Sequence, residues 1–383
     1  MNASLSWGDT ARVLAAEFGR RAAAHDRDGT FPHENFADLH TAGLLALAAP
    51  RALGGQGASS TQLAEVIGAI GYGCPATALV LSMQYIQQRQ AARAGSPWPE
   101  ALARRLVKDA VERGALINAL RVEPELGSPA RGGLPATVAT KTPDGWRISG
   151  RKIYSTGAPV LKWLAVWART DEATPRVGTF LVRADDPGVL IEETWDHLGL
   201  RSSGSHDVVL DGVLTPADHA VGLVLPGEVP AKDGAFQAEM TLLLGALYNG
   251  VARAARDWLV AFLNQRVPSS LGASLATLPR FQESVGRIEG LLLSNRVLLE
   301  RLASDLDSGA GASVVEAGLA KNLLMAQAIA VVQDALALTS NHGLSRHNPL
   351  ERHLRDVLCG RVHTPQEDSV FVSAGRFALE TGR

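Results

Sequence analysis

The chain carries three adjacent side chains with useful chemistry: Tyr154, Ser155 and Thr156. A flavin ring needs hydrogen-bond donors at its N5 edge and at its pyrimidine carbonyls, and a flat neighbour that excludes water. Ser155 and Thr156 offer hydroxyls and backbone amides, and Tyr154 offers the plane. We therefore predict that these residues contact a flavin. The alternative is an ordinary strand made of β-favouring residues.

Two further side chains are candidates for binding a phosphate. Ser128 follows Gly127 in a turn-like segment, where its hydroxyl and amide can face a phosphate; a plain turn serine is the alternative. Arg266 follows a long predicted helix, and a guanidinium binds phosphate oxygens in pairs. A solvated arginine at a helix end is the alternative for this residue.

His363 and Thr364 form the third group, close to the C-terminus. An imidazole that titrates near neutrality can protonate bound oxygen or deprotonate a substrate hydroxyl. The alternative for His363 is a histidine that is hydrogen-bonded in a packed loop. Thr364 cannot act as a base, because its hydroxyl has a pKa far above neutrality.

Composition limits what these groups can belong to. The chain has 383 residues, of which 46% are hydrophobic and 20% charged, enough for two or three substantial cores. A net charge of -2 leaves no basic excess, so we expect neither nucleic-acid binding nor anionic-membrane binding. The two cysteines, Cys74 and Cys359, lack metal-ligand spacing and are expected to be reduced, which fits a cytoplasmic setting. No signal peptide or membrane span is expected.

Hydrophobic periodicity divides the chain into three parts. Apolar residues recur at helical spacing up to about residue 113, and again in three long segments after residue 236. Between them, runs such as 163–168 and 177–182 alternate with turn signals, as is typical of strands. We predict a mainly α protein with a central β domain: helical residues 1–113, a β domain at 114–225 and a helical bundle at 226–383.

Four motifs in register show a family resemblance. Val122–Ser128 looks like the motif TEPxAGS, Lys152–Ala158 like KxWITNA, and Leu198–Asp207 like LGxRxS, while 334–356 is similar to a dinucleotide-side loop and the helix behind it. Over essentially its whole length the chain resembles the acyl-CoA dehydrogenase superfamily. The resemblance implies an N-terminal helical domain, a middle β-barrel, a C-terminal four-helix bundle and a homotetramer.

The resemblance also implies a set of flavin contacts. They are Val122, Ser128, Tyr154, Ser155, Thr156, Arg266 and Gly343, with Arg266 reaching the flavin pyrophosphate of a neighbouring subunit. Val122 stands where the family has threonine. The adenine-binding loop reads Ala337, Ser340 and Asn341, with only Gly343 kept. The cofactor is therefore expected to be FAD, with FMN alone as the alternative.

The catalytic base is where the sequence departs most from the dehydrogenases. Aligning Arg355-Asp356 with the family's RDA sequence places Thr364 at the glutamate that abstracts a proton from an acyl-CoA. Glu239 on the first long C-terminal helix is one relocated candidate for the base. Another is the acidic pair Glu367 and Asp368.

His363 is similar in position to a histidine in the superfamily's monooxygenase branch, exemplified by dibenzothiophene monooxygenase. There the histidine is placed to help reduced flavin activate oxygen, and Ser155 would add a hydroxyl beside it. A second histidine of that branch has no counterpart at 83–88. We predict a monooxygenase with catalytic His363 and Ser155 that obtains reduced flavin from a separate reductase, since no GxGxxG unit occurs.

Two alternatives remain open. One is an FAD-dependent acyl-CoA dehydrogenase with a relocated base, which passes its electrons to an electron-transfer flavoprotein. The other is a relative without flavin that acts as a binding or assembly protein.

Overall fold

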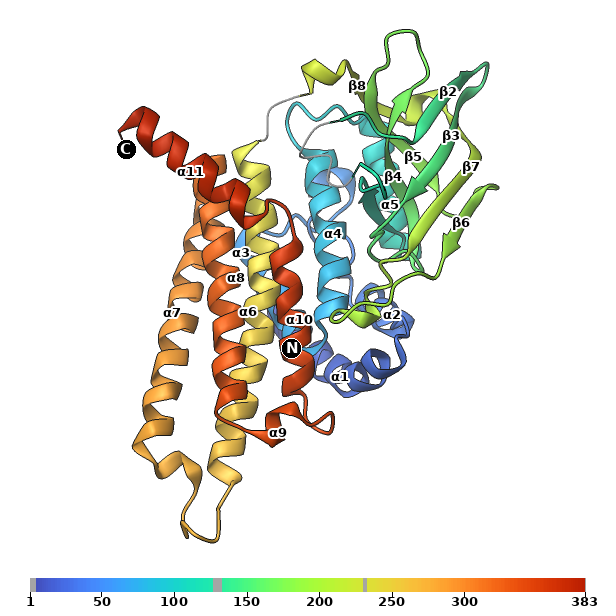
Figure 1. Ribbon diagram of the computed structural model, residues 1–383. Helices are drawn as coiled ribbons and strands as arrows, with labels where there is room; N and C mark the ends of the chain where they lie inside the picture. The colour runs from blue at the N-terminus through green and yellow to red at the C-terminus, as the bar shows by residue number, and fades with distance from the viewer. Residues whose placement is uncertain (1–4, 127–132, 230–232, 383) are drawn as a thin grey trace.

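The computed structural model describes residues 5–126, 133–229 and 233–382. Figure 1 shows a sheet-containing part beside a bundle of long helices, with shorter helices between and below them. The predicted order of helical, β and helical parts is confirmed.

The N-terminal part is helical, and its helices begin at recognisable caps. Ser6 caps the first helix through Asp9, and Ser59 and Gln62 form a capping box on the third. The fourth helix is buried along nearly its whole length, so it lies at the centre of the molecule. The helices are α1 (Trp7–Asp28), α2 (His33–Thr41), α3 (Ser60–Gly73), α4 (Pro75–Ala92) and α5 (Glu100–Arg113).

The central part is an eight-stranded sheet with the order β6-β7-β3-β2-β4-β5-β8, in which β1 pairs in parallel with β4. Antiparallel pairing of β3 with β7 sets Lys152 opposite Val208, so the end of β3 and the start of β7 meet. The strands are β1 (Leu116–Leu120), β2 (Val138–Thr142), β3 (Gly145–Lys152), β4 (Leu161–Thr170), β5 (Val177–Arg183), β6 (Val189–Glu192), β7 (Asp207–Pro216) and β8 (Ala220–Val224).

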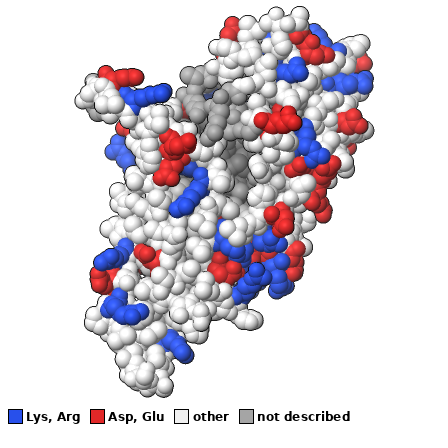
Figure 2. Space-filling model, viewed as in Figure 1, with Lys and Arg blue, Asp and Glu red and all other residues white. Residues whose placement is uncertain are grey.

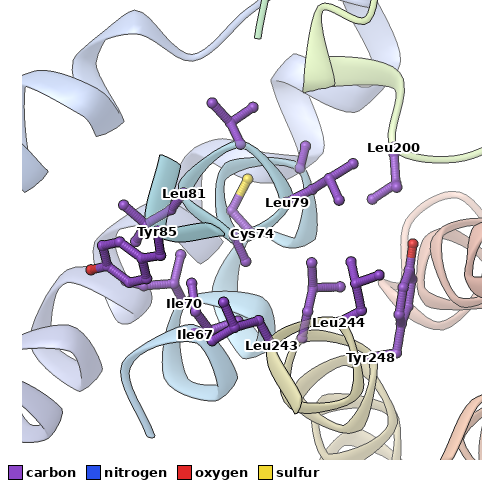
Figure 3. Close-up of a cluster of buried hydrophobic side chains, with 14 of the residues drawn as sticks. Ile67, Ile70, Cys74, Leu79, Leu81, Tyr85, Leu200, Leu243, Leu244 and Tyr248 are labelled. Atoms are coloured by element: carbon purple, nitrogen blue, oxygen red, sulfur yellow. The ribbon is translucent and has the colours of Figure 1, made fainter. Parts of the chain in front are cut away.

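The C-terminal part contains the three longest helices, which cover the segments expected from helical periodicity. Their apolar sides meet one another, and α6 also packs on α3 and α4. Figure 3 shows this junction, where Leu243 and Leu244 face side chains of α3 and α4 and Tyr248 lies beside Leu200. The helices are α6 (Gly234–Gln265), α7 (Pro279–Ser308), α8 (Val314–Ala337), α9 (Asn341–Leu344), α10 (Leu350–Leu358) and α11 (Glu367–Thr381).

Helix α8 is long and apolar enough to cross a membrane by length and composition alone. Half of its most apolar window is buried inside the protein, and it packs against α6, α7, α10 and α11. The central helix of a bundle has the same composition, so this helix is weak evidence for a membrane span.

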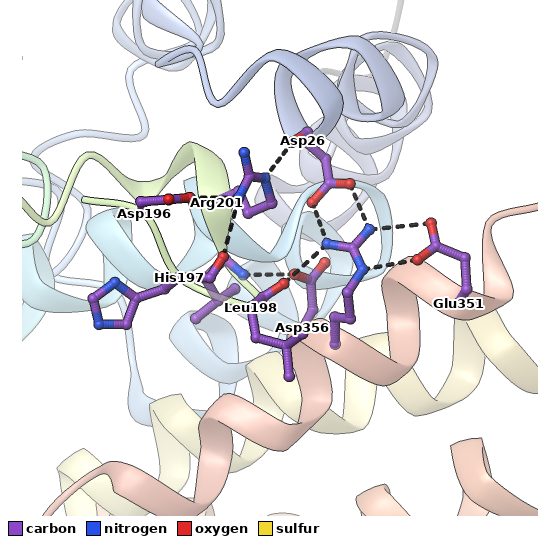
Figure 4. Close-up of polar contacts among 9 residues, drawn as sticks. Asp26, Asp196, His197, Leu198, Arg201, Glu351 and Asp356 are labelled. Carbon is purple, nitrogen blue, oxygen red and sulfur yellow. Dashed lines mark hydrogen bonds and ion pairs between the residues drawn. The ribbon is translucent and has the colours of Figure 1, made fainter. Parts of the chain in front are cut away.

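One short segment joins all three parts of the molecule. The backbone amide of Leu200 donates to Asp356 Oδ1 of α10 at 2.7 Å, and Arg355 donates to the carbonyl of Leu198 at 3.0 Å. Arg355 also donates to both carboxylate oxygens of Asp26 in α1, at 2.8 and 2.6 Å. Figure 4 shows these bonds converging on α10. The loop before β7 is thereby fixed to both helical parts.

The backbone of Gly199 approaches α10 so closely that no side chain fits. A Cβ added at Gly199 would lie 2.1 Å from the carbonyl oxygen of Arg355. We expect Gly199→Ala to push the loop off α10 and to lower the free energy of unfolding by about 1–3 kcal/mol, as overpacking does. Denaturant unfolding would measure the loss. Gly227→Ala is the control, because nothing lies within 4 Å of an added Cβ there; equal stability of the two variants would contradict the close approach.

Candidate functional site

The predicted flavin-contacting residues form a turn directly after β3. Ile153 N donates to Val122 O at 3.0 Å, so Val122 lies beside this turn. Ser155 N donates to His206 O at 3.1 Å, which ties the turn to the loop before β7. Tyr154 has a φ of 57°, an uncommon backbone conformation for a residue with a side chain. The structure therefore brings Val122, Tyr154, Ser155 and Thr156 together.

Tyr154 presents a flat aromatic surface to its surroundings. Its side chain is 54% exposed, although it is large and apolar. Trp195 and His197 stack on each other with ring centroids 3.6 Å apart, and both meet the Tyr154 ring edge-on. These two rings support Tyr154 from one side and leave a planar face for a ligand.

The neighbouring hydroxyls differ in what they bind. Ser155 is 1% exposed, and its Oγ has no hydrogen-bond partner among the described residues. Thr156 Oγ1 lies 3.0 Å from Ser205 Oγ, and Asn118 donates to the carbonyl of Thr156 at 3.0 Å. A buried hydroxyl without a partner is costly and is usually satisfied. The free hydroxyl of Ser155 therefore fits a ligand with polar atoms, such as a flavin ring edge.

A buried ion pair holds the two segments of this site together. Lys152 and Glu123 are almost fully buried, and Lys152 Nζ donates to Glu123 Oε1 at 2.6 Å. Burial lowers the pKa of Lys152 to about 8, so this side chain remains charged at neutral pH. Glu123 also accepts from Thr137 N at 3.1 Å and Thr137 Oγ1 at 2.6 Å. This bonding fixes Val122 in place beside the turn.

His363 follows α10 in the chain and lies against α6. Its Nε2 is 2.7 Å from the hydroxyl of Tyr248, and Lys321 Nζ donates to its carbonyl oxygen at 2.8 Å. Burial and, to a lesser degree, the charge of Lys321 lower the pKa of His363 to about 4. This lowered pKa runs against the expectation of an imidazole that titrates near neutrality, although the residue as a whole is only partly buried. His363 is neutral at physiological pH.

The remaining predicted flavin contacts lie elsewhere in the chain. Arg266 is exposed at the C-terminal end of α6, and the buried Gly343 is in α9, both at the end of the bundle away from the sheet. An added Cβ at Gly343 would lie 2.2 Å from Thr339 Oγ1, so the turn there requires glycine. Ser128 lies outside the described residues. Within one chain, neither Arg266 nor Gly343 joins the turn at Tyr154.

The alternative bases have contrasting environments. Glu367 and Asp368 are exposed in the first turn of α11. Glu239 is largely buried in α6 and pairs with Arg89 of α4 at 3.3 Å. Burial raises the pKa of Glu239 to about 7.

Several residues of the site carry no signal in the sequence. Tyr248 is the partner of His363, yet it lies 115 positions away within an apolar helix. Asn118 donates a hydrogen bond to the carbonyl of Thr156, yet it belongs to β1, whose sequence is that of an ordinary buried strand. Trp195 and His197 directly precede the LGxRxS-like segment. Their two aromatic rings at alternate positions were the one feature of the sequence that could have indicated a place beside Tyr154.

Comparison with known proteins agrees with this architecture. Residues 6–99, 121–213 and 242–367 match the N-terminal, middle and C-terminal domains of acyl-CoA dehydrogenase. The chain is 34% identical over 379 residues to the putative acyl-CoA dehydrogenase YdbM of Bacillus subtilis, covering 98% of this chain and 97% of that protein. The chain belongs to the acyl-CoA dehydrogenase family. The predicted resemblance is confirmed, and so is the prediction of a flavin-dependent oxidoreductase at the level of the family.

Two other members of the acyl-CoA dehydrogenase family bear on the chemistry. L-evernosamine nitrososynthase of a Micromonospora species is 31% identical over 365 residues, covering 90% of this chain and 82% of that enzyme. The crystal structure of KijD3 in complex with dTDP is 28% identical and superposes with a TM-score of 0.84, covering 98% and 96% of the two chains. A second KijD3 structure, with a TM-score of 0.77, contains FMN and a dTDP-linked amino sugar. A flavin cofactor is consistent with these relatives.

The protonation state of His363 can be measured directly. We expect its ring signals in nuclear magnetic resonance spectra to stay those of neutral imidazole as the pH falls from 8 to 5, with the midpoint near 4. Because this pKa lies below the unfolded value of about 6.5, the stabilisation from burying neutral His363 is present above pH 6.5 and is lost as the pH falls toward 4. The ring signals that disappear from the spectrum of the His363→Gln variant are those of His363. A midpoint near 6.5 would contradict the lowered pKa of His363.

Proposed function

We propose that this protein is a flavin-dependent monooxygenase that uses reduced flavin and O2. The observation that carries the proposal is the pair of residues at 363 and 364. By the alignment of Arg355-Asp356 with the family's RDA sequence, Thr364 corresponds to the glutamate of the dehydrogenases, and beside it His363 has a lowered pKa and is held by Tyr248. This pair lacks the carboxylate that abstracts a proton next to a thioester carbonyl, but it retains a group that can accept a proton.

The turn after β3 is proposed to hold the flavin. Tyr154 would lie against the ring, Ser155 Oγ would bond its edge, and Val122 would cover it with an apolar surface. Thr156, whose amide donates to the Tyr154 carbonyl at 2.9 Å, would hold the shape of the turn beside the ring. Bound reduced flavin supplies two electrons, so that one oxygen atom of O2 enters the substrate and the other leaves as water. FMN and FAD both remain compatible with these contacts, because all of them are made to the ring.

His363 is proposed to accept a proton from the substrate, and Tyr248 is proposed to hold the ring of His363 in place. If Nε2–H donates to the Tyr248 oxygen, Nδ1 of the neutral ring is free to take a proton from a substrate N–H or O–H. Burial raises the pKa of Tyr248 well above its usual value, so Tyr248 stays protonated and serves as a fixed hydrogen-bond partner. Tyr248 is thus a positioning residue for His363.

The relatives support this choice. A nitroso group contains a nitrogen–oxygen bond, so the nitrososynthase that is 31% identical to this chain forms such a bond on its substrate. We infer from this that the substrate is a small molecule oxygenated at an electron-rich atom, with reduced flavin supplied by a separate reductase.

The second candidate is an acyl-CoA dehydrogenase with Glu239 as base and an electron-transfer flavoprotein as acceptor. A carboxylate with a pKa of about 7 suits a general base, and YdbM bears a putative dehydrogenase name. Against it, Glu239 precedes Tyr248 by nine residues, roughly 13 Å along a helix axis, and it is paired with Arg89.

We also propose that the protein is a homo-oligomer, with a tetramer as the expected state. Exposed apolar side chains occur on α7 at Leu293 and Val297 and on α11 at Phe371 and Val372. Figure 1 shows α11 projecting beyond the bundle. Apolar surface of this kind is commonly covered by another subunit. A monomer in light scattering would contradict the proposal and remove the intersubunit role of Arg266.

An anaerobic experiment separates the two enzymatic functions. We expect a panel of acyl-CoAs to leave the visible absorption band of the oxidised, flavin-loaded protein unchanged, because no base acts on them. We also expect the chemically reduced protein to consume O2. His363→Gln should change the rate of reoxidation by at least ~10-fold, the range of proton-transfer catalysis, while the affinity for flavin stays the same.

Two variants sharpen this test. Tyr248→Phe keeps the ring and removes the hydroxyl, so a smaller change in the same direction as for His363→Gln identifies positioning. Bleaching of the flavin by any acyl-CoA would refute the monooxygenase proposal. If Glu239→Gln then abolished that bleaching, the dehydrogenase with a relocated base would be established.

A further inference from the structure

A cavity lined by several charged side chains lies between α1, the loop before β7 and the start of α10. Its volume is about 530 Å³, enough for more than a single small ion. Figure 2 shows basic side chains, with acidic ones among them, gathered on the part of this face where α1 and α10 lie in Figure 1. The arginines that line the cavity are Arg27, Arg201, Arg346, Arg352 and Arg355.

The cavity keeps a positive charge after its internal pairs are counted. Its two lining carboxylates, Asp26 and Glu351, are both bound by Arg355, as Figure 4 shows. Arg27 also pairs with Asp28 and Arg201 with Asp196, so five arginines against these four carboxylates leave a formal charge of +1. Arg346 and Arg352 are the two lining arginines that form no ion pair among the described residues. Because Arg355 occupies both acids, they oppose an incoming anion less than free carboxylates would.

Arg352 is the most informative member of this group. Its side chain is 9% exposed, and its Nε is buried without a hydrogen-bond partner among the described residues. The nearby Asp356 forms no ion pair with it there and instead accepts from Leu200 N at 2.7 Å. A buried guanidinium N–H without a hydrogen-bond partner is unfavourable, and in Arg352 this applies to Nε and not to the two terminal nitrogens. Such a group is stabilised when an anion fills the cavity beside it.

We propose that this cavity binds the phosphate or diphosphate group of an organic ligand, with Arg352 and Arg346 as its main contacts. A guanidinium binds phosphate oxygens in pairs, and the exposed Arg346 at the entrance adds a second cation. His197 also lines the cavity, and its ring lies 5.9 Å from that of Tyr154. The cavity therefore adjoins the proposed flavin site, so the phosphate belongs either to the flavin or to a separate ligand.

The test uses inorganic pyrophosphate as the probe, with the intact protein at constant ionic strength. We expect calorimetric titration to show binding to the wild type, and Arg352→Gln to weaken it by at least ~10-fold, as for loss of one charge-assisted bidentate contact. Arg287→Gln is the matched control, since Arg287 is exposed on α7 and pairs only within its own helix. It should bind pyrophosphate as the wild type does.

Thermal unfolding distinguishes a ligand site from a structural role. If Arg352 serves a ligand, Arg352→Gln should melt at the same or a higher temperature than the wild type without pyrophosphate, and pyrophosphate should no longer raise that temperature. A lower melting temperature with unchanged affinity would overturn the proposal, as would a wild type that does not bind pyrophosphate. Should Arg352→Gln not fold, the exposed Arg346→Gln carries the same affinity test.

Competition with FMN identifies the source of the phosphate. If pyrophosphate and FMN exclude each other, and Arg352→Gln also weakens the binding of FMN, the cavity holds the phosphate of the flavin. If both bind together and FMN affinity is unchanged in the variant, the cavity holds the phosphate of a separate ligand. Both outcomes support a phosphate site, and neither depends on which reaction the protein catalyses.

Discussion

The hydrogen bond from the Leu200 amide to the Asp356 carboxylate joins two segments that lie 156 positions apart, and the geometry of the site depends on it. Leu200 begins the loop whose His206 carbonyl holds Ser155, and Asp356 precedes His363 by seven residues. Gly199 lets the two backbones touch. The bond therefore ties the loop that holds the turn at Tyr154 to the helix that precedes His363.

Buried polar groups in this protein divide into those that hold the site and those left for a ligand. Lys152 and Glu123 satisfy each other and fix the turn. Ser155 Oγ and Arg352 Nε, in contrast, are buried without partners among the described residues. They are two of ten such atoms among the described residues, and we relate these two to a ligand because one lies in the turn at Tyr154 and the other lines the cavity beside His197. Both positions are reached from the same loop, which carries His197 and His206.

The family fold offers alternative places for a proton acceptor, and burial tunes each differently. Burial favours the uncharged form of a side chain, which lowers the pKa of His363 to about 4 and raises that of Glu239 to about 7. The same physical effect therefore gives a neutral imidazole at one place and a protonatable carboxylate at the other. A neutral imidazole next to Thr364 can accept a proton during oxygenation. Oxidation of a thioester would instead depend on the carboxylate of Glu239, which is paired with Arg89.

The sequence by itself determined the order of helical, β and helical parts, because apolar periodicity is a local property. It also determined that Tyr154, Ser155 and Thr156 form one group, and that Thr364 cannot be a base. Only the tertiary structure decided that burial lowers the pKa of His363, that Tyr248 is its partner, and that Arg352 Nε is buried without a partner among the described residues. The physical reason is that desolvation and partner choice arise where distant segments pack, and no local pattern in the chain records that packing.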